Sequence, residues 1–280
     1  MIQKLLKINL TNMLLKTVFF ILTFFLITGS LTAQDLNPDY TQRDSSELLL
    51  EKFKNGIDFY ANGNEPFWGL NIAMNQFIRF KELEGVEVDL GPVTAEKAMD
   101  ANVIRFAQQT EKGFFKVTVS QQECFDDMSG EKFDYRVIVE LNNPGDPDYR
   151  KFDGCGNYVP DYRLNRTWIL KQIGNDEVEG SSYTKGAPEI TFDIGKDKFS
   201  GSGGCNRIFG SLYSEYNILR FGDIASTMML CPGLDKEKQF IKSLEKVVSY
   251  ELSGNQLSLS NPDGLLMILY DPTLEGNKGD

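Results

Sequence analysis

The chain has 280 residues, with 29 Lys and Arg, 40 Asp and Glu and no histidine, and its formal net charge is −11. So acidic a protein repels phosphate backbones and anionic lipid headgroups, which excludes nucleic acid as a natural partner and otherwise favours simple solubility. The absence of histidine excludes Ser-His-Asp and Cys-His catalysis, together with histidine-based zinc hydrolysis.

Residues 1–33 have the layout of a secretory signal peptide. Three lysines precede an apolar run at 18–27, and small residues follow up to Ala33. This run is about half as long as the roughly 20 residues that a membrane-spanning helix requires. We expect cleavage after Ala33 and a secreted or periplasmic protein without a stable membrane span, with an uncleaved N-terminal anchor as the alternative. Cleavage removes three lysines and no acids, and so changes the net charge from −11 to −14.

The sequence pattern of residues 34–162 predicts a loose N-terminal segment followed by a β-rich domain. The polar stretch 34–55 is interpreted as a flexible segment or a single loose helix. From residue 56 to 162, short runs bounded by Gly, Asn, Asp or Pro alternate as half-buried strands do. Six strands are expected, at 67–72, 76–81, 86–90, 102–108, 114–120 and 133–141. A short helical connection is expected at 95–101. This spacing predicts a small antiparallel barrel or sandwich.

Three sequence blocks mark the first domain, namely Gly63-Asn-Glu-Pro-Phe-Trp68, Cys124-Phe-Asp-Asp-Met-Ser-Gly130 and Gly154-Cys-Gly156. Together they resemble an uncharacterised bacterial envelope domain, which implies a secreted or membrane-associated setting and reveals no function. Within them Glu65 is a motif residue. Trp68 is interpreted as a core anchor rather than a platform for stacking a ligand. Asp126 is interpreted as a turn cap, and a cation or acid–base site shared with Asp127 is the alternative.

A turn-rich stretch at 141–166 separates the first domain from a second, and we place the boundary between residues 162 and 163. Residues 163–272 predict a second β-rich domain and 273–280 a tail. Its strands are expected at 167–173, 189–194, 198–202, 208–213, 218–221, 228–230, 248–252, 256–260 and 265–270. A helix is expected at 235–248, with Asp235 as its cap and Phe240 and Leu244 on its apolar face. That face must pack on the sheet or close a barrel mouth.

The second domain resembles the META (HslJ-like) domain family. The resemblance rests on Trp168, on Gly-Ser-Gly-Gly-Cys-Asn at 201–206, on Thr227 within Ser-Thr-Met-Met-Leu-Cys at 226–231, and on the helix that follows. It implies a half-open antiparallel barrel closed by one helix, in an envelope protein linked to heat shock or another stress response. It implies no catalytic mechanism.

The residues of the glycine-rich motif have structural explanations that need no catalysis. Gly203 and Gly204 allow positive φ angles and close approach of the backbone beside a buried bridge. Asn206 can satisfy the backbone of a turn through its side chain. A phosphate-binding loop is excluded, because no Gly-Lys-Ser/Thr follows and the context is strand to strand.

Four cysteines follow the signal peptide: Cys124, Cys155, Cys205 and Cys231. An even number of cysteines in an exported chain predicts disulfides, and four cysteines allow three pairings. Closeness in the chain favours Cys124 with Cys155 and Cys205 with Cys231, each bond being worth roughly 3 kcal/mol. A four-cysteine zinc site is the alternative. Structural zinc sites draw on closely spaced cysteine pairs, and no such pair occurs here.

These observations predict a mainly β protein with two small antiparallel barrel-like domains, the second a half-open barrel with a capping helix. We expect a non-catalytic envelope or stress-response protein without cofactor or metal. It would bind a small apolar ligand, in a cavity under the helix, or an envelope partner. An acidic inhibitor or scavenger of a cationic protein, such as a lysozyme-like enzyme, is one alternative. A glycan hydrolase with two carboxyl groups about 5–10 Å apart is another.

Overall fold

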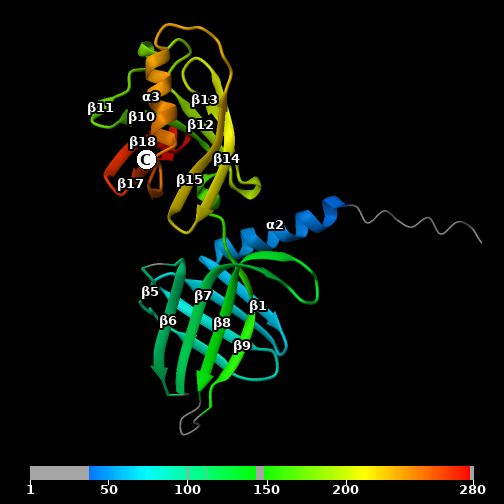
Figure 1. Ribbon diagram of the computed structural model, residues 1–280. Coiled ribbons are helices and arrows are strands. Elements are labelled where there is room, and N and C mark those ends of the chain that lie inside the picture. Colours follow the sequence, from blue (N-terminus) through cyan, green and yellow to red (C-terminus); the bar gives the residue numbers. More distant parts are fainter. Residues whose placement is uncertain (1–37, 100, 112, 143–147, 278–280) are drawn as a thin grey trace, which may run out of the picture. The chain divides into compact units, whose positions relative to one another are not determined.

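The computed structural model describes residues 38–99, 101–111, 113–142 and 148–277 (Figure 1). The expected signal peptide, residues 34–37 and the end of the expected tail lie outside the described residues. The chain divides into two compact units, Met1–Ser45 and Ser46–Asp280, and both β-sheets lie in the second unit. In the described part of the chain, no helix is long and apolar enough to cross a membrane. The helix considered for 34–55 is α2, Pro38–Lys54.

The first sheet contains nine antiparallel strands instead of the six expected. Their order in the sheet is β4-β3-β2-β1-β9-β8-β7-β6-β5. The strands are β1 (Phe59–Asn64), β2 (Phe67–Ala73), β3 (Phe77–Glu82), β4 (Glu87–Leu90), β5 (Glu96–Lys97), β6 (Val103–Thr110), β7 (Gly113–Phe125), β8 (Lys132–Asn142) and β9 (Arg150–Tyr158). The unexpected strands β1 and β9 lie side by side at the centre of the sheet. They carry Gly, Asn and Asp, which are poor strand formers that only tertiary packing keeps in a sheet.

The helical connection expected at 95–101 was wrong. Residues 96 and 97 form the edge strand β5, which pairs antiparallel with β6 through Glu96 and Arg105. The segment Ala-Glu-Lys-Ala is a good helix former, but local propensity is a weak effect that pairing with a neighbouring strand overrides. The sheet thereby gains an edge strand where a helix was expected.

The first sheet curls so that its two ends face one another across a common core. The rings of Phe80 on β3 and Phe115 on β7 are 5.8 Å apart, although four strands lie between β3 and β7 in the sheet order. Phe152 on β9 lies 5.0 Å from Phe80. Alternate residues of each strand are buried, as on β8, where every second side chain points into the core. This confirms a barrel-like antiparallel domain.

The second sheet forms the half-open barrel that the family resemblance implies. Its nine strands are β10 (Thr167–Ile173), β11 (Asp176–Glu177), β12 (Glu189–Asp193), β13 (Lys198–Ser202), β14 (Arg207–Glu215), β15 (Ile218–Ser226), β16 (Ser249–Ser253), β17 (Gln256–Asn261) and β18 (Gly264–Tyr270). Pairing of β10 with β18 closes the ring. The barrel is half-open because β15 and β16 pair only through Ile218 and Ser249. The stretch 228–230, expected as a strand, is a loop after β15.

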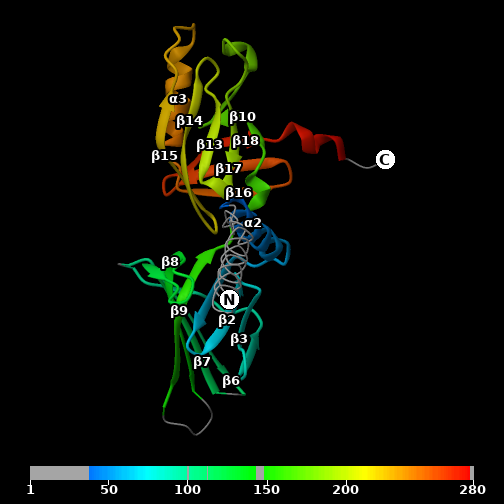
Figure 2. The same cartoon turned by 90° about the vertical axis from the view of Figure 1, so that its right-hand side faces the viewer.

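The capping helix α3 runs from Leu234 to Leu244, four residues shorter at its end than expected. Figure 2 shows it along one side of the second sheet. Asp235 does not cap it: Gly233, with φ of +83°, is the N-cap residue, and Asp235 lies in the first turn, where its charge suits the helix dipole. Phe240 and Leu244 are completely buried in the core that also holds Trp168. The helix face expected over a cavity is therefore packed against core side chains.

Candidate functional site

Both favoured disulfides are present. Cys124 is bonded to Cys155 and Cys205 to Cys231, and no cysteine is free. The zinc alternative is therefore wrong. In the described part of the chain, no other group of Cys, Asp and Glu side chains is arranged to hold a metal ion. Two disulfides are typical of an oxidising compartment outside the cytoplasm.

The glycine-rich motif of the second sheet folds around a buried carboxylate, Glu237 of α3. Glu237 Oε2 accepts hydrogen bonds from the backbone N–H groups of Asn206, at 2.7 Å, and Cys205, at 3.1 Å. Its other oxygen accepts from Asn206 Nδ2 at 2.7 Å. Three donors thus compensate for burying this side chain, as a buried carboxylate requires. The carboxylate also ties the helix to the motif.

The two motif glycines are required by this arrangement. A Cβ on Gly203 would lie 2.6 Å from Glu237 Cγ, which no real side chain tolerates. Gly204 has a φ of +96°, a conformation that side-chain-bearing residues rarely adopt, and the ring of Tyr183 lies against it. Substitution at either position would displace Glu237 or Tyr183.

Asn206 joins the two cysteine motifs. Its Oδ1 accepts hydrogen bonds from Thr227 Oγ1, at 2.9 Å, and from the Met229 backbone N–H, at 2.7 Å. Its Nδ2 donates to Glu237 and, at 3.3 Å, to the Met229 carbonyl. We call this network the clasp; it consists of residues 203–206, Thr227, Met229, Glu237 and the Cys205–Cys231 bond. The polar groups of the clasp form hydrogen bonds with one another, so we assign the clasp a role in stabilising the fold.

Glu237 was missed in the sequence, although one signal was available. It precedes Phe240 by three residues and Leu244 by seven, so all three share one face of the helix. A single acid on an apolar helix face indicates a buried partner. Trp168, the other motif residue of this sheet, is buried in the core, and its Nε1 donates to the Leu164 carbonyl at 3.0 Å.

In the first sheet, two of the three motif blocks meet at Trp68. The indole lies between two glycines: a Cβ on Gly63 would overlap Trp68 Nε1, and one on Gly154 would lie 2.6 Å from its Cζ2. Trp68 is buried, and its Nε1 has no hydrogen-bond partner in the described part of the chain. Glu65 is exposed in the turn between β1 and β2. The motif glycines thus make room for a core tryptophan.

Asp126 of the Cys124 block forms the turn expected beside the disulfide. Its Oδ1 accepts from the backbone N–H groups of Ser129, at 2.7 Å, and Met128, at 3.0 Å, and from the Ser129 hydroxyl, at 2.9 Å. Its Oδ2 accepts from Asn64 Nδ2 at 2.8 Å. Asp127 is exposed. These bonds make Asp126 a turn cap that also links the turn to β1.

This turn predicts a pH dependence of stability. The Ser129 backbone N–H keeps the pKa of Asp126 below its ordinary value against the opposing effect of burial, with help from the Asn64 and Ser129 side chains. A carboxyl whose pKa is lower in the folded state contributes stability above the unfolded pKa of about 3.9, and this is lost as the pH falls through the folded pKa. We expect the stability difference between the parent and Asp126→Asn to shrink below about pH 4 in urea unfolding. Parallel pH curves for the two proteins would contradict this.

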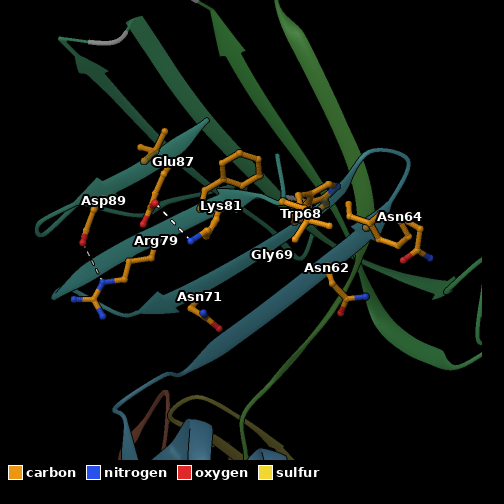
Figure 3. A pocket seen from close by; sticks show the side chains of 14 residues that line it. Asn62, Asn64, Trp68, Gly69, Asn71, Arg79, Lys81, Glu87 and Asp89 are labelled. Carbon is orange, nitrogen blue, oxygen red and sulfur yellow. Dashed lines mark hydrogen bonds and ion pairs between the residues drawn. The ribbon is translucent and has the colours of Figure 1, made fainter. Parts of the chain in front are cut away.

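A groove with a volume of about 650 Å³ lies on the outer face of β1–β4 (Figure 3). Its floor is Gly69 of β2, which pairs with Asn62 on β1 and with Lys81 on β3. A Cβ built on Gly69 would meet no atom within 4 Å, so the missing side chain opens the groove. Sequence inspection missed this site because an isolated strand glycine ordinarily indicates a bulge.

The two ends of the groove differ in chemistry. At one end Phe67 and Leu83 are 48% and 69% exposed, which is unusual for apolar side chains so close together. At the other, Lys81 pairs with Glu87 at 3.8 Å and Arg79 pairs with Asp89 at 3.2 Å (Figure 3). The groove thus offers an apolar surface and a charged rim.

Amide side chains line the remaining edge of the groove. Asn62 and Asn64 both donate their Nδ2 groups to Asp126 Oδ2, at 3.4 and 2.8 Å. Within the described residues their Oδ1 atoms have no hydrogen-bond donor. Asn71 Oδ1 accepts from Lys52 of α2 at 3.2 Å, and the Lys52 ammonium lies 4.7 Å from the ring centroid of Tyr60. The end of α2 therefore lies beside the groove and fixes one of its amides.

The fold and these sites define a disulfide-bonded, mainly β protein with a half-open barrel. The META domain family model matches residues 161–271, so this part of the chain is a META domain, and the expected resemblance is confirmed. The motif resemblance of the first domain stays a prediction. No curated protein matches the chain.

Two solved structures are similar to part of the chain. One is an NMR structure that is 23% identical, covers 41% of this chain and 94% of its own, and has a TM-score of 0.32. The other is the crystal structure of a DUF4847 family protein from Bacteroides vulgatus. It is 18% identical, covers 42% of this chain and 96% of its own, and has a TM-score of 0.30.

Proposed function

We propose that this is an exported, non-catalytic binding protein that holds a small ligand in the groove over Gly69. The observation that carries the proposal is the groove itself: a strand glycine leaves its floor open between exposed apolar side chains and a charged rim. Its volume of about 650 Å³ lies within the range of small-molecule sites, about 300–1,000 Å³. The ligand would place an apolar part against Phe67 and Leu83 and a polar edge toward Asn62 and Asn64.

Two features of the chain support export: its disulfides and the sequence pattern of its first 33 residues. Both disulfides are formed, and such bonds persist in oxidising compartments. The pattern of residues 1–33 is that of a signal peptide, and their removal would leave a ligand-binding protein in the periplasm or outside the cell. The resemblance to the META domain family implies an envelope protein linked to stress, and we include this role in the proposal.

The two alternatives have less support. An acidic inhibitor of a cationic protein rests on net charge, which is equally explained by solubility. A glycan hydrolase would need a free carboxyl pair, and the adjacent acids Asp126 and Asp127 do not supply one. Asp126 accepts five hydrogen bonds, three of them within its own turn, and its lowered pKa disfavours proton donation.

Filling the groove tests the proposal. Gly69→Phe places a ring in open space on a strand without positive φ, so the fold should persist while the groove is blocked. With the neutral apolar fluorophore N-phenyl-1-naphthylamine as probe, we expect the dissociation constant to rise at least tenfold, or about 1.4 kcal/mol.

The matched control is Gly195→Phe, because Gly195 also has open space and lies away from the groove, in the short 3-10 helix Ile194–Lys196 between β12 and β13. Its affinity for the fluorophore should equal that of the parent. If the parent does not bind the fluorophore, or if both variants bind as the parent does, the groove is not an apolar ligand site.

A further inference from the structure

The loop that follows β15 exposes more apolar surface than a soluble protein normally shows. Met228 is 98% exposed and Leu230 is 94% exposed, and Met229 between them is half-exposed. By contrast, Met267 on β18 is completely buried. Nearby, Phe209 on β14 is also exposed, in strand register with Ala225 shortly before the loop. Contiguous exposed apolar side chains commonly mark an interaction surface.

This loop is held in place by the clasp. Cys231 is bonded to Cys205, and the backbone of Met229 is fixed by Asn206 through both its N–H and its carbonyl. At the start of the loop, the Thr227 N–H donates to the Arg207 carbonyl at 3.1 Å. The exposed side chains are thus presented on an ordered backbone. Binding through them would cost little additional conformational entropy.

Three basic residues, Lys185, Arg207 and Lys236, lie on the segments beside the loop and the clasp. Lys185 Nζ lies 3.9 Å from Met229 Sδ, and the Arg207 backbone N–H donates to Thr227 Oγ1 at 3.1 Å. Lys236 lies over the ring of Tyr183, which itself packs on Gly204 of the clasp. None of these three cations forms an ion pair within the described residues. The nearby acids are Asp235, which is paired with Lys238, Glu189, two strands from Arg207, and the buried Glu237, whose oxygens accept hydrogen bonds from Cys205 and Asn206 of the clasp.

The overall negative charge of the protein does not govern this surface. Residues 56–160 hold 18 acidic and 10 basic side chains, whereas residues 161–271 hold 15 and 12. Most of the acidic excess therefore lies outside the META domain. At physiological ionic strength, exposed charges separated by more than about 8 Å are largely screened from one another. Among the exposed charges beside the loop, the three cations outnumber the acids Asp235 and Glu189.

We propose that the loop 227–231 is a peripheral membrane anchor for a bilayer that contains anionic lipids. Met228 and Leu230 would enter the boundary between headgroups and acyl chains, while Lys185, Arg207 and Lys236 would contact the headgroups. Apolar side chains flanked by cations are the features that bind an interface without spanning it. Only two side chains insert, so the binding would be reversible. It would place the groove over Gly69 in a protein retained at a membrane surface.

Vesicle sedimentation tests this proposal. The secreted form, residues 34–280 with both disulfides formed, would be mixed with phosphatidylcholine vesicles with or without about 30% phosphatidylglycerol. We expect binding to the anionic vesicles. Met228→Asp/Leu230→Asp should lower the partition coefficient at least fivefold, and Lys185→Glu/Arg207→Glu should lower it on anionic vesicles. The matched control, Met99→Asp, changes another fully exposed methionine and should have no effect.

Several results would overturn the anchor. The first is the absence of binding to both vesicle types, and the second is unchanged binding by the Met228/Leu230 variant. The third is a dimer that this variant dissociates, since the loop would then bind a second copy of the chain instead of a membrane. Circular dichroism and the disulfide mass check folding, and Met228→Ser/Leu230→Ser repeats the test without added charge. Gly69→Phe should bind vesicles normally, so the anchor and the groove can fail independently.

Discussion

Replacing Glu237 with alanine is expected to destabilise the second sheet by about 3–5 kcal/mol. The change removes the acceptor of two buried backbone donors, the Asn206 and Cys205 N–H groups, and leaves Asn206 Nδ2 with only its longer bonds to the Met229 carbonyl and Cys205 Sγ. Each buried donor left without a partner costs about 1–3 kcal/mol. The change also opens a space between α3 and the motif, because Gly203 packs against the Glu237 side chain. The free energy of unfolding, measured by urea titration with circular dichroism, should fall accordingly.

Two variants make this measurement specific to the clasp. Asp235→Ala removes an exposed acid from the same helix and should change stability by no more than about 0.5 kcal/mol. Glu237→Gln keeps one acceptor oxygen but places an NH₂ group against existing donors, so an intermediate loss is expected. Hydrogen exchange should show increased opening of residues 203–206 and 227–231. A Glu237→Ala protein as stable as Asp235→Ala would refute the structural role given to the clasp.

Gly154→Ala is expected to destabilise the first sheet by about 3 kcal/mol or more, although it adds a single methyl group. The new Cβ would overlap the Asn62 carbonyl oxygen of the neighbouring strand and lie 2.6 Å from Trp68 Cζ2. Neither neighbour can move freely, since one is backbone in the centre of the sheet and the other is a buried indole ring. Overpacking at this position must therefore separate β1 from β9 or displace Trp68.

The control for this prediction is Gly69→Ala, on β2, which is separated from β9 by β1 in the same sheet. Its Cβ would meet open space, so this variant should be as stable as the parent or up to about 1 kcal/mol more stable. Both variants would be compared by urea unfolding of the oxidised protein. A loss below about 1 kcal/mol for Gly154→Ala would show that the junction around Trp68 adapts to the added volume.

The predictions that succeeded rest on local signals. Both disulfide pairings were predicted from the closeness of the cysteines along the chain. The helix α3 was predicted from the helical spacing of its apolar residues. The META domain followed from two cysteine motifs in order. In each case the residues that carry the signal are neighbours in sequence. The segment 95–101 failed under the same procedure, because strand pairing overrode a helical pattern.

By itself, then, the sequence determined the β-rich class, the two disulfides and the META motifs. Tertiary structure alone decided that β1 and β9 are central strands, that Glu237 is the buried centre of the clasp, and that Gly69 opens a groove. The physical reason is cross-strand register. Which face a strand residue occupies, and whether a missing side chain leaves a turn, a close contact or open space, depends on strands distant in the chain. Gly154 and Gly69 look alike in sequence, and only their neighbours distinguish them.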